Sequence, residues 1–159
     1  VSYLRPSRFC QSDLLTEYAA QQFRGLDGGA RIAAIMDWAR SEISYVPGSS
    51  SATTSAVDSF VARRGVCRDY AHLVCSLARA GNIPARYTSV YGADVDPPDF
   101  HAVAEVWLEG AWHLVDATGM SHAADMVVIG SGRDASDVAF METEEWARPL
   151  WQKVDVRRM

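Results

Sequence analysis

The feature that most constrains the fold is residues 65–73, GVCRDYAHL, where a glycine is followed closely by a cysteine that opens a helical pattern. Behind Cys67, apolar residues recur at spacings of three and four, the period of a helix with one buried face; they are Ala71, Val74, Cys75 and Ala78. Gly81 and Pro84 then provide the usual punctuation of a helix C-terminus. The sequence therefore predicts a helix from Cys67 to about Gly81, with Cys67 in its first turn.

The position of Cys67 at a helix start has a chemical consequence. The unpaired N–H groups and the helix dipole favour a negative charge there, so the thiol is expected to gain thiolate character. The ordinary alternative is a small buried residue, which is the commoner state of a free cysteine. Cys75, on the apolar side of the same helix, is interpreted in that way. For Cys67, residues further along the chain favour the reactive interpretation.

Those residues lie in two β-prone runs that flank a short glycine-containing turn and predict a hairpin. Pairing of Leu108 with Ala111 would make His101 and Asp116 diagonal neighbours on one face of the sheet. A carboxylate beside an imidazole fixes its tautomer and stabilises its protonated form. With Cys67 at the other ring nitrogen, the three side chains would be a nucleophile, a base and an orienting group.

Four blocks of sequence, in this order, resemble the transglutaminase-like superfamily, and in particular its bacterial branch of transglutaminase-like cysteine proteases. The blocks are residues 65–73, 81–87, 101–106 and 116–118, and the flanking residues 4–10 and 132–138 add to the likeness. Val103 stands where many relatives have Trp, and Ala117 where they usually have Pro. Neither departure removes a reactive group, so substrate contacts and turn shape are affected rather than the triad.

The resemblance implies an α+β fold with a papain-like, transglutaminase-like core, in which N-terminal helices, with the nucleophile at a helix start, pack on a mainly antiparallel sheet. The order of helices first and strands second independently predicts α+β. The resemblance also implies a catalytic triad of Cys67, His101 and Asp116 in a thiol-dependent acyl-transfer enzyme. The backbone N–H of Cys67 is a candidate oxyanion donor, and the sequence names no second one.

The fate of the thioester intermediate divides the possible activities. Transfer to water makes a hydrolase, and transfer to an amine makes a transglutaminase. Hydrolysis of peptide or related amide bonds is preferred by resemblance to the bacterial branch, so a peptide or protein substrate is expected. A non-catalytic binding module on the same fold is the third alternative. Retention of the cysteine, the histidine and the aspartate weighs against it.

Composition predicts one soluble domain over residues 1–159, because 48% of the residues are hydrophobic and 22% are charged. The net charge of −5 and the absence of a dense Lys/Arg run exclude nucleic acid and anionic membrane as expected partners. No apolar stretch approaches the ~20 residues of a membrane span. No Cys-x-x-Cys or His-x-x-x-His pair is present, so neither a metal nor a cofactor is expected.

Cysteine usage and the first residue give two further expectations. Three cysteines without framework spacing predict reduced thiols and a cytoplasmic location. The chain begins at Val1 instead of Met, and relatives in the bacterial branch often carry a β-rich domain upstream. A fragment that lacks this domain is therefore expected.

The remaining pattern predicts further elements: helices over residues 12–23 and 30–44, a helix capped by Ser55 and ended by Gly65, and strands over residues 85–91, 126–129 and 153–157. The apolar face of the third helix is expected to contain Val57, Phe60 and Val61.

Single residues give expectations of their own. Trp38 and His72 are expected to pack in the interior, and Arg68 to be a solvated surface residue. Charge pairing among Arg133, Asp134 and Asp137 is expected to tie that loop to the core.

Overall fold

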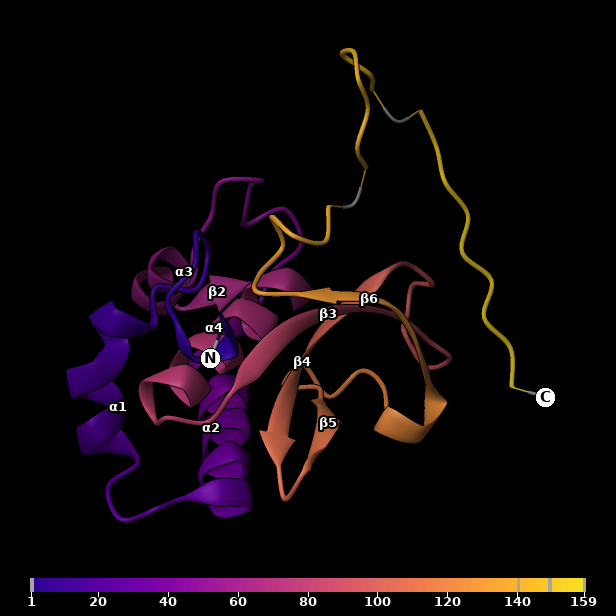
Figure 1. The fold of residues 1–159 in the computed structure, drawn as a ribbon. Coiled ribbons are helices and arrows are strands. Elements are labelled where there is room, and N and C mark those ends of the chain that lie inside the picture. The colour runs from indigo at the N-terminus through magenta and orange to yellow at the C-terminus, as the bar shows by residue number, and fades with distance from the viewer. Residues whose placement is uncertain (1, 140, 149, 159) are drawn as a thin grey trace.

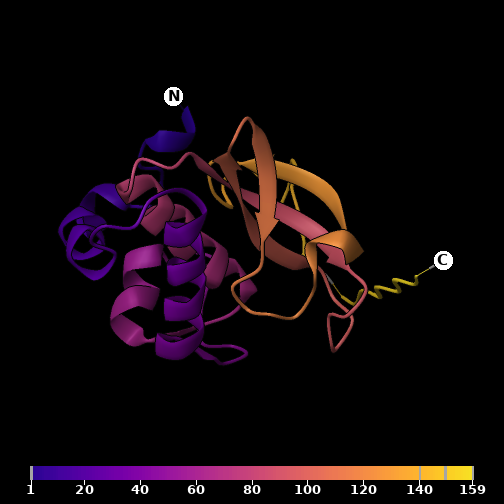
Figure 2. The same cartoon turned by 90° about the horizontal axis from the view of Figure 1, so that it is seen from below.

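A layer of helices packs against an antiparallel sheet, which confirms the predicted α+β class (Figure 1). Figure 2 shows the same two layers from below, with the helices on one side and the sheet on the other. The structure is a computed structural model and describes residues 2–139, 141–148 and 150–158. Its elements, in chain order, are η1 (Ser2–Leu4), η2 (Ser12–Leu15), α1 (Thr16–Gln22), α2 (Gly28–Glu42), β1 (Ser44–Tyr45), α3 (Ala56–Ala62), β2 (Arg64–Gly65), α4 (Cys67–Ala80), β3 (Ala85–Gly92), β4 (His101–Leu108), β5 (Ala111–Val115), η3 (Ala123–Asp125) and β6 (Met126–Gly132).

The main sheet has the strand order β5-β4-β3-β6, and each neighbouring pair is antiparallel. Leu108 pairs with Ala111 across the β4–β5 hairpin, as predicted. At the opposite edge of the sheet, the register between β3 and β6 shifts after Ser89, which pairs with Gly130. This irregularity lets β6 run to Gly132 instead of ending at Gly130. A second, small sheet pairs β1 with β2 in parallel.

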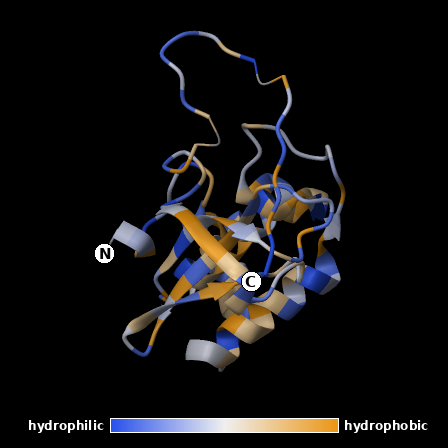
Figure 3. Cartoon of the chain, turned by 90° about the vertical axis from the view of Figure 1, so that its right-hand side faces the viewer, coloured by the Kyte–Doolittle hydropathy of each residue, from blue (hydrophilic) through white to orange (hydrophobic). Residues whose placement is uncertain are grey.

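Helix α4 is the centre of the molecule, because every residue from Asp69 to Arg79 is buried. It lies between the other helices and strands β3 and β4. The largest fully buried apolar side chains include Phe23, Ile35, Leu73, Leu77 and Val106. Burial of each contributes on the order of 1.5–3 kcal/mol. Figure 3 shows apolar segments in both the helices and the strands, so the core is shared by the two layers.

Most boundaries agree with the sequence pattern to within a few residues, and the third helix shows the clearest differences. Helix α3 ends at Ala62, because Arg63 adopts a left-handed conformation with φ 54°. Gly65, predicted to end this helix, instead belongs to β2. Val61 was expected on the apolar face but is 74% exposed, because this two-turn helix buries Ala56 and Ser59. The predicted cap is confirmed, since Ser55 accepts from the Asp58 N–H.

The prediction of a terminal strand over residues 153–157 was wrong. No strand is present there, and the segment extends away from the helical layer, as Figure 1 shows. Side chains on either side of the segment contact the body: Gln152 donates to Asp99 at 2.6 Å, and Arg158 pairs with Asp125 at 2.8 Å. An alternating pattern does not form a strand by itself, and this segment pairs with neither edge strand of the main sheet, β5 or β6. Among the described residues, no helix is both long and apolar enough to cross a membrane.

Candidate active site

A tight turn holds Cys67 at the first position of α4. The N–H of Val66 donates to Asp69 Oδ2 at 2.8 Å, which satisfies one of the groups left unpaired before the helix. A Cβ atom on Gly65 would lie 2.6 Å from the Asp69 Cβ, so only glycine fits there. Cys67 itself is half-buried. The local sequence therefore fixes both the turn and the direction in which the cysteine leaves it.

The β4–β5 hairpin brings His101 and Asp116 together, as its predicted register required. His101 Nε2 lies 2.9 Å from Asp116 Oδ2, and both side chains are buried. Asp116 Oδ1 accepts from the N–H of Thr118 at 2.9 Å and from its hydroxyl at 2.6 Å. Asp116 Oδ2 also accepts from the N–H of Ser121 at 3.1 Å. Both carboxylate oxygens are thus held by donors, which fixes the plane of the group that faces the imidazole.

The pKa values of the pair move in opposite directions. Burial alone would lower the pKa of His101, but hydrogen bonds with Asp116 and Cys67 outweigh it and raise the pKa to about 9. Burial alone would raise the pKa of Asp116, but the hydrogen bond and charge of His101 outweigh it and lower the pKa. Each partner therefore stabilises the charged form of the other, as expected for an imidazolium–carboxylate pair.

The structure places all three predicted residues in one group. Because Nε2 of His101 faces Asp116, Nδ1 is the ring nitrogen left for Cys67, which helps to raise the pKa of His101. Cys67 and His101 line one cavity of about 580 Å³ between the two layers. Most of the other lining side chains are apolar, including Tyr87 and Phe100. The thiol and the imidazole therefore face a space large enough for part of a peptide.

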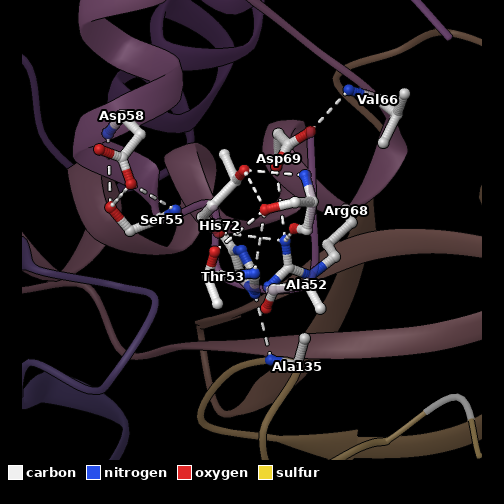
Figure 4. Close-up of polar contacts among 11 residues, drawn as sticks. Ala52, Thr53, Ser55, Asp58, Val66, Arg68, Asp69, His72 and Ala135 are labelled. Carbon is white, nitrogen blue, oxygen red and sulfur yellow. Dashed lines mark hydrogen bonds and ion pairs between the residues drawn. The ribbon is translucent and has the colours of Figure 1, made fainter. Parts of the chain in front are cut away.

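His72 lies behind this group and confirms the predicted packing role. Its ring is stacked 5.5 Å from that of Phe9 and lies 5.1 Å from that of Tyr87, which lines the cavity. Its Nε2 accepts from the Ala135 N–H at 3.1 Å (Figure 4). Burial, and then the charge of Arg68, lower the pKa of His72 to about 3. His72 is therefore a neutral acceptor that holds the Ala135 loop against α4.

The loop over residues 133–137 is tied to the core in a way that differs from the predicted charge pairing. Arg133 and Asp137 form an ion pair at 2.8 Å, but within the loop itself. Besides the bond from Ala135 to His72, a link to the core comes from Asp134, which is fully buried and accepts from the Phe9 N–H at 2.8 Å. A buried carboxylate that accepts a backbone N–H replaces the expected ion pair.

The expectation that Arg68 is a solvated surface residue was wrong. Its guanidinium donates to the carbonyls of Ser51, Ala52 and Thr54 at 3.0–3.2 Å. Figure 4 shows Arg68 beside Ala52. The guanidinium also lies 4.6 Å from the centroid of the Phe9 ring. Arg68 therefore anchors the loop before α3, and Ala52 of that loop lines the cavity. The acceptors are backbone carbonyls, which have no signature in the sequence.

This anchoring predicts a measurable effect of Arg68→Lys. Lysine keeps the charge but lacks the planar fork that reaches three carbonyls. We expect a loss of about 1–3 kcal/mol in the free energy of unfolding in urea, together with faster proteolytic cleavage within residues 47–54. Arg24→Lys, at an exposed site, is the matched control and should change neither quantity. Equal behaviour of the two variants would contradict the anchoring role.

The sequence did not point to Tyr45, whose hydroxyl lies beside Cys67. The only available signal was a short β-prone stretch before a serine-rich loop. Among the described residues, no group of three His, Cys, Asp or Glu side chains is arranged to hold a metal ion. Of the other cysteines, Cys10 and Cys75 are fully buried, as predicted for Cys75.

Comparison with known proteins identifies the family. Residues 17–117 match the model of the transglutaminase-like superfamily, which covers more than half of the chain. The chain therefore belongs to the transglutaminase-like superfamily.

The chain is also similar in sequence to curated proteins of mycobacteria. An uncharacterized protein of Mycobacterium leprae is 33% identical over 117 residues, which cover 68% of this chain and 42% of that protein. An uncharacterized protein of Mycobacterium tuberculosis is 30% identical over 145 residues, covering 80% of this chain and 46% of that protein. The chain thus spans a little under half the length of these curated relatives.

The chain is also similar to solved structures. The "putative cysteine protease" of Cytophaga hutchinsonii has a TM-score of 0.84 and 43% identity, covering 86% of this chain and 48% of that one. The periplasmic domain of TgpA from Pseudomonas aeruginosa has a TM-score of 0.56 and 26% identity, covering 73% of this chain and 45% of that one.

Proposed function

We propose that this protein is a thiol-dependent acyl-transfer enzyme that hydrolyses peptide or related amide bonds. The observation that carries the proposal is the hydrogen bond between Asp116 and His101, together with the place of His101 and Cys67 in the wall of one cavity. A thiol, an imidazole and a carboxylate in this order provide a nucleophile, a proton carrier and an orienting group. The superfamily membership and the cysteine protease-like neighbour support the same chemistry.

In the proposed reaction, the thiolate sulfur of Cys67 adds to the carbonyl carbon of the substrate. The imidazolium of His101 then donates its proton to the departing amine as the C–N bond breaks, which leaves a thioester on Cys67. A water molecule gives a proton to His101 and attacks the thioester. The C–S bond breaks, the acid product leaves, and the proton on His101 returns the pair to its starting state. Asp116 holds His101 in the orientation that both proton transfers need.

Selective reactivity of Cys67 tests the proposal before any substrate is known. Iodoacetamide at mildly acidic pH should label Cys67 well before Cys10 and Cys75, because both of those thiols are fully buried. His101→Ala should slow the labelling of Cys67, since the imidazolium that stabilises the thiolate is lost. Mass spectrometry of the labelled peptides measures all three rates in one experiment. His113→Ala, which removes an exposed imidazole, is the matched control.

Burial alone can make Cys67 the fastest of the three thiols, so the His101 comparison is decisive. An unchanged Cys67 rate in His101→Ala would favour a binding module on the same fold. Amine transfer is tested separately, by adding a primary amine with a glutamine-containing peptide and looking for the joined product.

We also propose that residues 1–159 form one domain, which the core shared by helices and strands supports. The free state of the three cysteines supports a cytoplasmic location as a further part of the proposal.

A further inference from the structure

The described residues 150–158 form no helix or strand and lie beyond the sheet, on the side away from α1 (Figure 1). Within this segment Val154 and Val156 are half-buried, and the other residues are exposed. Among the described residues, no backbone hydrogen bond joins the segment to the rest of the chain. The segment is therefore attached mainly through its polar side chains.

Two polar contacts, one near each end, attach the segment to the body. Gln152 Nε2 donates to Asp99 Oδ1 at 2.6 Å. Arg158 forms ion pairs with Asp94 and with Asp125, the latter at 2.8 Å. The Arg158 side chain is 57% exposed, and Gln152 and Asp99 are exposed as well. Contacts that face water are weak, so the segment can be released while the core stays folded.

The first of these contacts lies in the wall of the active-site cavity. Gln152 and Asp99 both line the space that contains Cys67 and His101. Asp99 is only two residues before His101, so its position is tied to the start of β4. The carboxamide NH₂ group of Gln152 thus takes up an acceptor beside the reactive pair.

A second hollow, of about 400 Å³, continues from this cavity. The Phe100 side lines both spaces, so they meet at this residue. The other walls of the hollow are Tyr91 and Val127 on the body and residues 153–157 on the segment. A substrate chain that runs from the cavity past Phe100 therefore enters a space that the segment closes on one side.

We infer that residues 150–158 form a strap across one end of the substrate cleft, which must be released before a long peptide can occupy it; the inference rests on the proposed function. In the closed position, Gln152 holds Asp99. When the strap opens, Asp99 accepts an N–H group of the substrate backbone instead. Because only the open form admits a long substrate, any change that loosens the strap raises the rate with that substrate by the factor by which the open population grows.

Two alkylating reagents of different size test this inference on the thiol of Cys67. One is iodoacetamide, and the other is a heptapeptide with an iodoacetyl group on the short side-chain amine of a central diaminopropionic acid, so that it extends in both directions from the sulfur. We expect Gln152→Ala and Arg158→Gln each to raise the rate with the peptide reagent about threefold, and the double variant about tenfold. The rate with iodoacetamide should stay near that of the wild type, because this small molecule does not need the space beneath the strap. Mass spectrometry of the labelled Cys67 peptide measures both rates.

Arg157→Gln is the matched control. It removes the same charge from the same segment, but Arg157 pairs with Asp155 inside the segment instead of with the body. Both of its rates should equal those of the wild type.

The distant variant separates a strap from a simple filling of the cavity, because Arg158 does not line that space. A faster peptide reaction in Gln152→Ala alone would overturn the inference, since the cavity would merely have been widened. No increase in any variant, or an equal increase with both reagents, would also overturn it. None of these outcomes affects the proposed function, which depends on the separate comparison of His101→Ala with the wild type. An unchanged iodoacetamide rate also shows that the variants are folded and that Cys67 keeps its surroundings.

Discussion

Asp116→Asn is expected to slow acylation of Cys67 by about 10³-fold at neutral pH. The surrounding donors determine how the new amide must lie. Thr118 donates twice to Oδ1 and Ser121 donates once to Oδ2, so the amide oxygen remains on the Thr118 side, and the NH₂ group takes the place of Oδ2 opposite His101. That NH₂ group donates to Nε2 and leaves the imidazole proton on Nδ1, which faces Cys67. The imidazole can then no longer accept the thiol proton.

The rate at which p-nitrophenolate is released from p-nitrophenyl acetate in a single turnover, with enzyme in excess, measures the acylation of Cys67 in wild type and variant. Asp155→Asn removes an exposed carboxylate that is paired with Arg157, and it is the matched control for lost negative charge. Circular dichroism should show that both variants are folded. A rate for Asp116→Asn within tenfold of the wild type would mean that Asp116 does not set the tautomer of His101, and the triad proposal would lose its orienting group.

The free energy of unfolding is expected to be greatest near pH 6.5 and to fall on both sides, because two buried histidines have pKa values shifted in opposite directions. His72 has a folded pKa of about 3, below the ordinary 6.5, so the unfolded chain binds this proton more readily and acid favours unfolding. Protonation of Nε2 would also end its bond from the Ala135 N–H. Between pH 6.5 and 4.5, we expect a loss of about 2 kcal/mol from this residue.

On the alkaline side, the residue responsible is His101. Its folded pKa of about 9 lies above the ordinary 6.5, so the folded state holds a proton that the unfolded state has already released. The stabilisation is complete below pH 6.5 and disappears as the pH rises through 9. We expect a loss of about 3 kcal/mol between pH 6.5 and 9.5.

Urea unfolding from pH 4.5 to 9.5 measures both limbs of this curve. His72→Gln, which keeps an acceptor for Ala135, should flatten the acidic limb only, and His101→Gln the alkaline limb only. His113→Gln, at an exposed position, should leave the curve as in the wild type. A wild-type curve that is flat between pH 5 and 9 would contradict both assignments.

Local pattern was sufficient to predict the parts of the fold that depend on near neighbours. Helix α4 was predicted almost to the residue, because an apolar stripe, a glycine and a proline all indicate the same bounds. The hairpin register followed from a two-residue turn, and it correctly placed His101 beside Asp116. The expectation that Cys67 joins them came from the order of the family blocks, since local pattern does not show which helix packs on which strand.

What could not be predicted depends on distant contacts. Arg68 binds backbone carbonyls of a loop, and every residue type has such a carbonyl. The sequence around Arg68 therefore could not show that its side chain has these partners. Tyr45 reaches Cys67 through a parallel strand pair of only two residues each, too short to appear as periodicity. Residues 153–157 alternate like a strand, but no sheet edge pairs with them. In each case the environment of a residue depends on a segment that is distant in the sequence, and a single sequence does not show which distant segment lies beside it.

The division of the reactive group between the two layers has a consequence for how activity arises during synthesis. Cys67 belongs to the helical layer, whereas His101 lies in β4 and Asp116 directly follows β5, in a part of the chain that is translated later. A nascent chain that has completed only its helices carries an unpaired thiol and no acyl-transfer chemistry. In the proposed mechanism, the enzyme is switched on by the docking of the sheet onto α4, so an incompletely made chain is protected from reacting with itself or its neighbours.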